Sequence, residues 1–253
     1  MTTGQRQFFQ VTALVLSLFA LFLLVFSRAH EVQQTIQRQN PDLELIVPPS
    51  VKSSVKRQVY EDLPDIDITS WEYILCNPAH NIGQYAPEVV QVEGSTSYFD
   101  ARAVDALINL LNGAREAGYA PRLYVGYRSY INQAQQYNEQ VNKFLSQGYT
   151  QLDAEKAAAE ISAAPGTSKH QTGLGVDIID KYTETLSGFS LDPGFEAWLH
   201  EHCVEYGFIV RYPESKIGIT GRYEPWHVRY VGQIAANFMK VHDLCLEEFV
   251  NLY

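Results

Sequence analysis

An aspartate inside a short apolar run constrains the fold of this chain more than any other feature. Residues 173–180 read GLGVDIID, so Asp177 stands among glycines and branched aliphatic residues. Such residues favour a β-strand, in which Asp177 and Gly175 lie on the same face. A buried carboxylate costs several kcal/mol unless another group compensates it. Asp177 is therefore either exposed or close to a positively charged partner.

His170 precedes this strand and is separated from it by a glycine turn. The glycines at positions 173 and 175 disfavour a helix, so a loop, a turn and a strand are expected here. That path lets His170 and Asp177 face each other. The two side chains then form either a hydrogen-bonded structural pair or two ligands of a metal ion.

A second segment, RYEPWHVRYVG, covers residues 222–232. Pro225 cannot donate to a sheet ladder, so a strand begins near it or bulges there. Glu224 and His227 lie on either side of this bend and can reach one site. With His170 and Asp177 they supply the usual groups of a hydrolytic zinc site. Such a site has three ligands, an open position for water and a glutamate that takes the proton of that water.

A third segment, VGYRSYINQ, places Arg128 where a strand ends and a helix begins. Its guanidinium can hold a carboxylate through two parallel hydrogen bonds. An exopeptidase that cuts from the carboxyl end needs such a group. The alternative is an ion-paired arginine at the surface. No Gly-x-Ser-x-Gly sequence occurs, so a serine hydrolase is not supported.

The N-terminal part of the chain predicts export. Residues 8–26 carry no charge and nearly span a bilayer, and Arg6 lies on the side expected to face the cytoplasm. We expect residues 1–29 to be a cytoplasmic tip and a transmembrane signal-anchor; a cleaved signal peptide is the alternative. Residues 30–67 read as a polar linker and residues 68–253 as the folded domain. The protein would then be a single-pass protein of the cell membrane with its domain outside the cytoplasm, or a secreted protein.

Helical and strand patterns are interspersed in this domain, which predicts an α+β fold. We expect a small antiparallel sheet flanked by helices, with the metal site at the sheet. The formal net charge of −10 argues against nucleic acid as a partner, and we expect a monomer. The three cysteines, Cys76, Cys203 and Cys245, allow either one disulfide and a free thiol or three buried thiols.

Taken in order, the three segments resemble the VanY-like D-alanyl-D-alanine carboxypeptidases, zinc enzymes that trim the peptide stems of bacterial peptidoglycan. The family pattern is Tyr-Arg-Ser, then Ser-x-His-x-x-Gly-x-Ala-x-Asp, then Glu-x-Trp-His. Residues 127–129, 168–177 and 224–227 match it. The sequence departs from the pattern at Gly175, where the family usually has alanine. The similarity extends from residue 70 to about residue 245.

The resemblance implies one zinc ion per chain, held by His170, Asp177 and His227. It assigns Glu224 as the general base and then the general acid. It assigns Arg128 to the terminal carboxylate of the substrate and to stabilisation of the oxyanion.

The resemblance also implies substrate contacts by Ser168 and Gln133. The reaction expected from it is removal of the terminal D-alanine from peptidoglycan stem peptides, with D-Ala-D-Ala cleavage favoured. An L,D-carboxypeptidase acting on tetrapeptide stems is one alternative. A zinc endopeptidase and a non-catalytic cell-wall-binding module of the same fold are two others.

Overall fold

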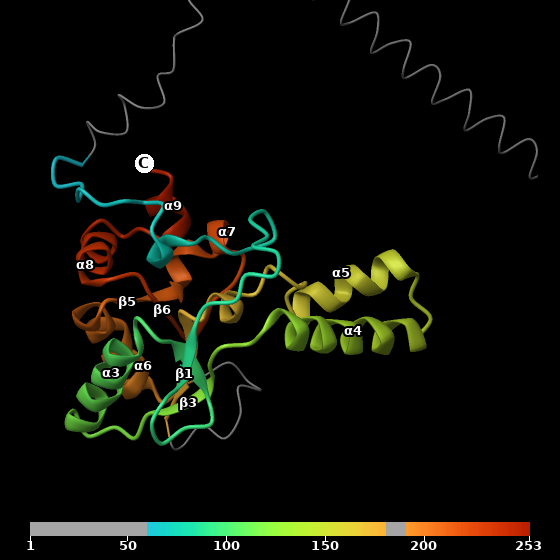
Figure 1. The fold of residues 1–253 in the computed structure, drawn as a ribbon, viewed down its shortest axis with the longest axis horizontal. Helices are drawn as coiled ribbons and strands as arrows, with labels where there is room; N and C mark the ends of the chain where they lie inside the picture. Colours follow the sequence, from blue (N-terminus) through green and yellow to red (C-terminus); the bar gives the residue numbers. More distant parts are fainter. Residues whose placement is uncertain (1–59, 181–190) are drawn as a thin grey trace, which may run out of the picture. The chain divides into compact units, whose positions relative to one another are not determined.

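One four-stranded antiparallel sheet lies at the centre of the computed structural model, which describes residues 60–180 and 191–253. Its strand order is β3-β4-β6-β5 (Figure 1). The strands are β3 (Arg122–Val125), β4 (Gly175–Ile179), β5 (Phe208–Tyr212) and β6 (Glu224–Tyr230). The two inner strands therefore come from segments about fifty residues apart in the sequence.

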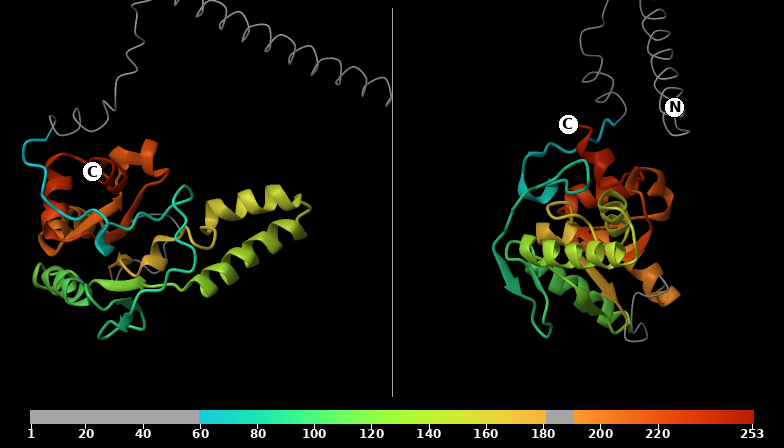
Figure 2. Two further views of the ribbon diagram at one scale, coloured as in Figure 1. Left: turned by 45° about the horizontal axis from the view of Figure 1, so that its top comes forward. Right: turned by 90° about the vertical axis from the view of Figure 1, so that its right-hand side faces the viewer.

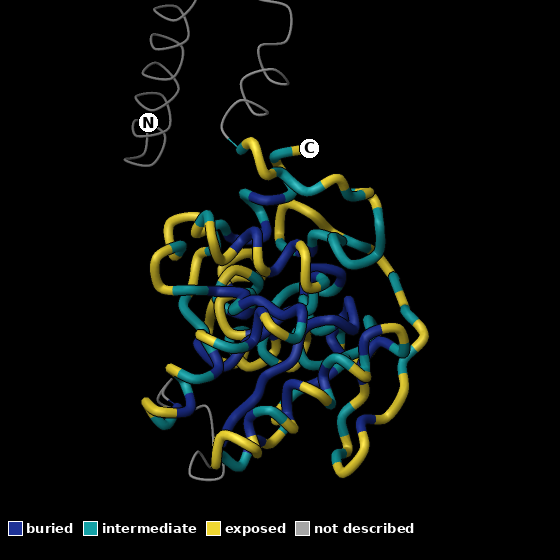
Figure 3. The backbone as a smooth tube through the Cα atoms, turned by 90° about the vertical axis from the view of Figure 1, so that its left-hand side faces the viewer, coloured by how far each residue is buried: buried dark blue, intermediate teal, exposed yellow. Residues whose placement is uncertain are grey.

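Strand β4 is buried along its whole length, on both faces. Figure 3 shows the buried segments running through the middle of the molecule. A strand covered on both faces reads as a nearly continuous apolar run, which explains the sequence around Asp177. Asp177 is therefore inside the protein, with 6% of its surface exposed.

Four helices pack around the sheet (Figure 1). Helix α3 (Val104–Glu116) buries four apolar residues at helical spacing, Leu107, Leu110, Leu111 and Ala114. The others are α6 (Pro193–His202), α8 (Gln233–Val241) and α9 (Leu246–Val250), which enter the same apolar core. The sheet and these helices confirm the expected α+β architecture.

Helices α4 (Tyr130–Ser146) and α5 (Gln151–Ile161) form a hairpin that extends away from the sheet (Figures 1 and 2). Both helices have a side-chain cap at the N-terminus, from Ser129 and Thr150. The hairpin has its own small core, built from Val141, Ala154 and Ala158 with three flanking aromatic and aliphatic residues. Helix α4 begins two residues after Arg128, so the position of the hairpin affects where the side chain of Arg128 lies.

The remaining elements are short. A two-stranded sheet pairs β1 (Val89–Gln91) with β2 (Tyr98–Asp100). Single turns are η1 (Trp71–Tyr73), η2 (Lys169–Thr172), η3 (Cys203–Tyr206), η4 (Glu214–Lys216) and α7 (Ile217–Thr220).

The described chain begins inside the segment expected to be a linker. Tyr60, Leu63 and Ile66 pack against the main core. The three cysteines are all buried and free, which settles their pairing in favour of thiols. The apolar run of residues 8–26 lies outside the described residues. Within residues 60–180 and 191–253, no helix is both long enough and apolar enough to cross a bilayer.

Candidate active site

The register of β4 and β6 places Asp177 directly opposite His227. Side chains opposite each other in an antiparallel pair approach closely. Nδ1 of His227 lies 2.8 Å from Oδ1 of Asp177, and both side chains are buried. If the register between β4 and β6 slipped by one residue, Asp177 and His227 would no longer lie on the same face of the sheet. The strand pairing therefore assembles the first half of the site.

His170 joins this pair from the short helix η2. Gly173 follows η2 in the left-handed conformation, with φ +74°, and turns the chain into β4. Nε2 of His170 then lies 3.6 Å from Oδ2 of Asp177. Each of the three residues His170, Asp177 and His227 offers one ligand atom, and these atoms lie within 4.8 Å of one another.

Two hydrogen bonds tie His170 to the end of β3. Its Nδ1 lies 3.1 Å from the carbonyl oxygen of Gly126, and its own carbonyl accepts a bond from the backbone N–H of Arg128, also at 3.1 Å. The first bond fixes the ring so that Nε2 points to Asp177. A partner of this kind is typical of histidines that bind metal ions.

The protonation and hydrogen bonding of His170, Asp177 and His227 indicate a metal site rather than a set of ion pairs. Burial lowers the pKa of His170 and of His227 to about 3, so both rings are neutral, the form that binds metals. Burial also raises the pKa of Asp177. Although Nδ1 of His227 is near, Oδ1 of Asp177 has no hydrogen-bond partner among the described residues. A divalent cation would satisfy this oxygen and both neutral rings.

Gly175 makes room for the ring of His227. A Cβ atom at position 175 would lie 2.8 Å from Nε2 of His227, too close without a shift of the ring. Gly175, which lies on the same face of β4 as Asp177, thus leaves space for the ring that stands opposite Asp177.

Glu224 stands at the start of β6, beside the cluster. Its Oε2 lies 3.7 Å from Nδ1 of His227, and its side chain is 20% exposed. The register with β5 is irregular between Val210 and Tyr212, opposite the segment that contains Pro225. Strand β6 begins at Glu224, one residue before Pro225, and its pairing is irregular there, as the proline predicts. It brings a carboxylate to the solvent side of the cluster, where a general base must stand to meet water.

These groups line one cleft of about 540 Å³. The cleft includes Arg128, Ser168 and Glu224 together with the three residues of the cluster. Burial lowers the pKa of Arg128, and the nearby Asp177 acts in the opposite direction. Five of the site residues expected from the sequence thus meet in one cavity with Arg128.

Gln133 has a different place. It is fully buried in α4 and does not line the cleft. Its Oε1 accepts a hydrogen bond of 3.0 Å from Nη1 of Arg128, and its amide donates to Ser162 and to the carbonyl oxygen of Ala163. Gln133 therefore holds the guanidinium of Arg128 in position from behind.

The cleft also has lining residues that were not expected from the sequence, among them Lys169, Tyr212 and Arg222. Nζ of Lys169 lies 4.5 Å from the ring centre of Tyr212, and the guanidinium of Arg222 lies 5.7 Å from it. Burial lowers the pKa of Lys169 to about 7, and the like charges of Arg211 and Arg222 act in the same direction. No sequence pattern marks these residues, because they come from separate segments that only the fold brings together around the ring of Tyr212.

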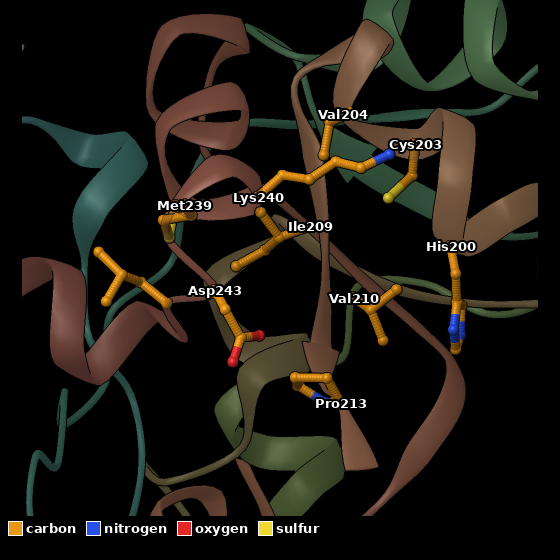
Figure 4. A pocket seen from close by; sticks show the side chains of 10 residues that line it. His200, Cys203, Val204, Ile209, Val210, Pro213, Met239, Lys240 and Asp243 are labelled. Atoms are coloured by element: carbon orange, nitrogen blue, oxygen red, sulfur yellow. The ribbon is translucent and has the colours of Figure 1, made fainter. Parts of the chain in front are cut away.

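A second, smaller hollow of about 190 Å³ lies between α6, β5 and α8. Figure 4 shows it lined mainly by apolar side chains, among them Val204, Ile209 and Met239. His200 borders it but is engaged elsewhere, since its Nε2 lies 3.1 Å from the carbonyl oxygen of Pro225. Its described lining contains no cluster of metal ligands. The cleft at His170 is the candidate active site.

Two histidines, one aspartate and an adjacent glutamate on a small α+β domain define a metal-dependent hydrolase. Residues 96–233 match the family model described as VanY: D-alanyl-D-alanine carboxypeptidase. A D-alanyl-D-alanine carboxypeptidase of Enterococcus faecalis (strain ATCC 700802 / V583) is 38% identical over 188 residues, which cover 73% of this chain and 68% of that protein. This chain therefore belongs to the VanY family and is a carboxypeptidase.

Solved structures agree with this assignment. The vancomycin-resistance D,D-pentapeptidase VanY of a VanB-type cassette, in complex with Zn(II), is 38% identical with a TM-score of 0.61. The match covers 72% of this chain and 99% of that one. The LdcB LD-carboxypeptidase is 35% identical with a TM-score of 0.59, over 74% of this chain and 92% of that one.

Proposed function

We propose that this chain is a zinc carboxypeptidase that removes the terminal D-alanine from peptidoglycan stem peptides, with cleavage of D-Ala-D-Ala favoured. One observation carries the proposal: His170, Asp177 and His227 converge in the same cleft as Glu224 and Arg128. The support for zinc is the donor set itself and the Zn(II) complex of the VanY relative.

His170, Asp177 and His227 would hold the zinc ion. When bound, zinc lowers the pKa of water towards about 7 and polarises a carbonyl oxygen. Among the residues of the chain, Glu224 takes the proton of the attacking water and later gives it to the leaving amine. Its side chain is 20% exposed and lines the cleft beside the cluster, so it meets both water and substrate.

Arg128 would bind the terminal carboxylate of the substrate. Gln133 holds the guanidinium of Arg128 in place by accepting a hydrogen bond from Nη1 of Arg128. Ser168 lines the same cleft and is buried, so it is placed to contact the peptide. A fixed carboxylate places the last peptide bond near the cluster, and this positioning lowers the entropic part of the barrier.

An L,D-carboxypeptidase is the second candidate, because the LdcB LD-carboxypeptidase matches nearly as well as VanY. The test is a digest of separate pentapeptide and tetrapeptide stems by the zinc-loaded protein, followed by assay of free D-alanine. Release from the pentapeptide alone supports the D,D activity, and release from the tetrapeptide alone supports the L,D activity. Release from neither, with zinc bound, contradicts both.

The location of the enzyme is part of the proposal. Residues 8–26 would anchor the chain in the cell membrane, with residues 68–253 outside the cytoplasm as the catalytic domain. Fractionation of cells that produce the full chain tests this. Recovery of the intact chain from the membrane fraction supports an anchor, and recovery of a shortened chain from the medium supports a cleaved signal peptide.

A further inference from the structure

The cleft has two cationic ends, with the metal-binding cluster between them. Arg128 follows β3, at one edge of the sheet, and Tyr212 ends β5, at the other edge. Asp177 and His227 lie on the two inner strands. Neighbouring strands are about 4.8 Å apart, so the two edges are separated by about 14 Å.

The cations at the β5 edge gather around the ring of Tyr212. The guanidinium of Arg211 lies 5.0 Å from the ring centre, that of Arg222 5.7 Å and the ammonium of Lys169 4.5 Å. This concentration of positive charge occurs in a chain whose net charge is −10.

These cations differ in how far they are compensated. Arg211 is fully buried and makes two hydrogen bonds to the carboxylate of Glu247. Arg222 is 42% exposed and makes a single bond of 3.2 Å to Oε1 of Glu224. Lys169 has no carboxylate within 4.0 Å in the part of the chain that the structure describes. Lys169 and Arg222, which both line the cleft, are thus the basic groups there with the least compensation by carboxylates.

We propose that Lys169 and Arg222 form a carboxylate-binding subsite for the part of the stem peptide that precedes the scissile bond. This inference rests on the proposed function. If the terminal carboxylate lies on Arg128 and the scissile bond at the cluster, the preceding residues run towards Tyr212. The ring of Tyr212 lies 5.3 Å from the ring of His227, so the subsite meets the residues that come shortly before the scissile bond. The subsite therefore selects stems with a carboxylate in their middle part.

Two carboxylates of a stem could fill this subsite: the α-carboxylate of a γ-linked glutamate, or the side-chain carboxylate of a diamino diacid at the third position. Three pentapeptides distinguish them. The first has free glutamate and a third-position lysine, the second has the glutamate α-carboxamide and lysine, and the third has the carboxamide and diaminopimelate. The readout is kcat/KM for release of D-alanine.

We expect the wild-type protein to cleave at least one carboxylate peptide about 10- to 100-fold more efficiently than the carboxamide-lysine peptide, because a charge-assisted contact is lost. A preference for the first peptide identifies the glutamate, and a preference for the third identifies the diamino diacid. Lys169→Gln and Arg222→Gln should each reduce the preference to about threefold or less. Arg115→Gln, which removes an exposed charge on α3, should retain it.

The ratio between peptides is the measurement because Arg222 also contacts Glu224. If the loss of Arg222 disturbs Glu224, kcat/KM falls by the same factor for all three peptides. Loss of the subsite instead lowers kcat/KM only for the peptides that carry the carboxylate. Arg222 is exposed, so its variant tests the inference even if Lys169→Gln folds poorly. Equal kcat/KM on all three peptides, or an unchanged preference in both variants, would overturn the inference.

The subsite can also be tested without turnover. Calorimetric titration of the same peptides into zinc-loaded Glu224→Gln protein should show the same order of affinity, and Lys169→Gln in that background should remove it. If no peptide releases D-alanine but this order of affinity is observed, the proposed function fails and the subsite stands. Equal affinities for the three peptides contradict the subsite alone.

Discussion

Asp177 and His227 face each other across β4 and β6, and Oδ1 of Asp177 lies 2.8 Å from Nδ1 of His227. Within the described residues, this oxygen nevertheless makes no hydrogen bond. A buried carboxylate beside two neutral imidazoles is unfavourable unless a cation joins them. The strand pairing thus brings together groups that need a metal ion. The stability of the domain should depend on that ion.

We therefore expect zinc to raise the melting temperature and a chelator to lower it. At free zinc a hundred times the dissociation constant, the gain in unfolding free energy is about 2.7 kcal/mol. Asp177→Asn should abolish the zinc-dependent gain, whereas Asp105→Asn, at an exposed position of α3, should retain it. Scanning calorimetry with and without zinc checks this. Equal zinc-dependent gains in both variants would contradict the role of Asp177.

Glu224→Gln should retain zinc and lose most turnover. The amide keeps the size of the side chain but cannot take a proton, so kcat should fall by about 10²–10⁴. Metal content by atomic absorption and D-alanine release together separate the two roles. Turnover close to that of the wild type in a zinc-loaded variant would remove Glu224 from the mechanism.

Gln133→Leu should weaken substrate binding without touching the metal. The variant loses the 3.0 Å bond to Arg128, so the guanidinium is less firmly placed. Since hydrogen bonds to charged groups contribute about 1.5–3 kcal/mol, kcat/KM should fall about 10- to 100-fold. We expect most of the loss in KM, with unchanged zinc content. Arg128→Gln should cause at least the same loss, and a larger effect on kcat than on KM in Gln133→Leu would contradict a positioning role.

Glu247→Gln should lower the free energy of unfolding rather than the rate of the reaction. Arg211 is fully buried and Glu247 is its carboxylate partner, with 14% of the side chain exposed. Removing one member of a buried pair costs about 3–5 kcal/mol. Urea denaturation measures the change. Glu201→Gln, which breaks an exposed pair with Lys240, is the control and should leave stability almost unchanged.

The same pair predicts a pH dependence of stability. Burial raises the pKa of Glu247, but the hydrogen bonds from Arg211 and other groups outweigh it, so the pKa lies below its ordinary value of 4.5. A carboxyl group with a lowered pKa in the folded state stabilises the protein above the unfolded pKa. That contribution is lost as the pH falls through the lowered value. The stability difference between wild type and Glu247→Gln should therefore be full near neutral pH and shrink below pH 4.5.

The sequence alone determined the chemical groups of the site and the elements that carry them. A nearly continuous run of branched apolar residues predicts β4, and apolar residues at helical spacing predict α3, because these patterns reflect burial of one local element. Pro225 predicts a strand start or a bulge at this point of β6, because it has no N–H to donate. The residues of the metal cluster were recognisable for the same reason, since their types and order are properties of the chain itself.

Only the tertiary structure decided how those groups act together. The opposition of Asp177 and His227 depends on a strand register between segments about fifty residues apart. The burial of Gln133 behind Arg128 depends on where the hairpin of α4 and α5 begins. The gathering of Lys169 and Arg222 at Tyr212 depends on three separate segments. No local pattern encodes such distances, because they follow from packing free energy summed over the whole core.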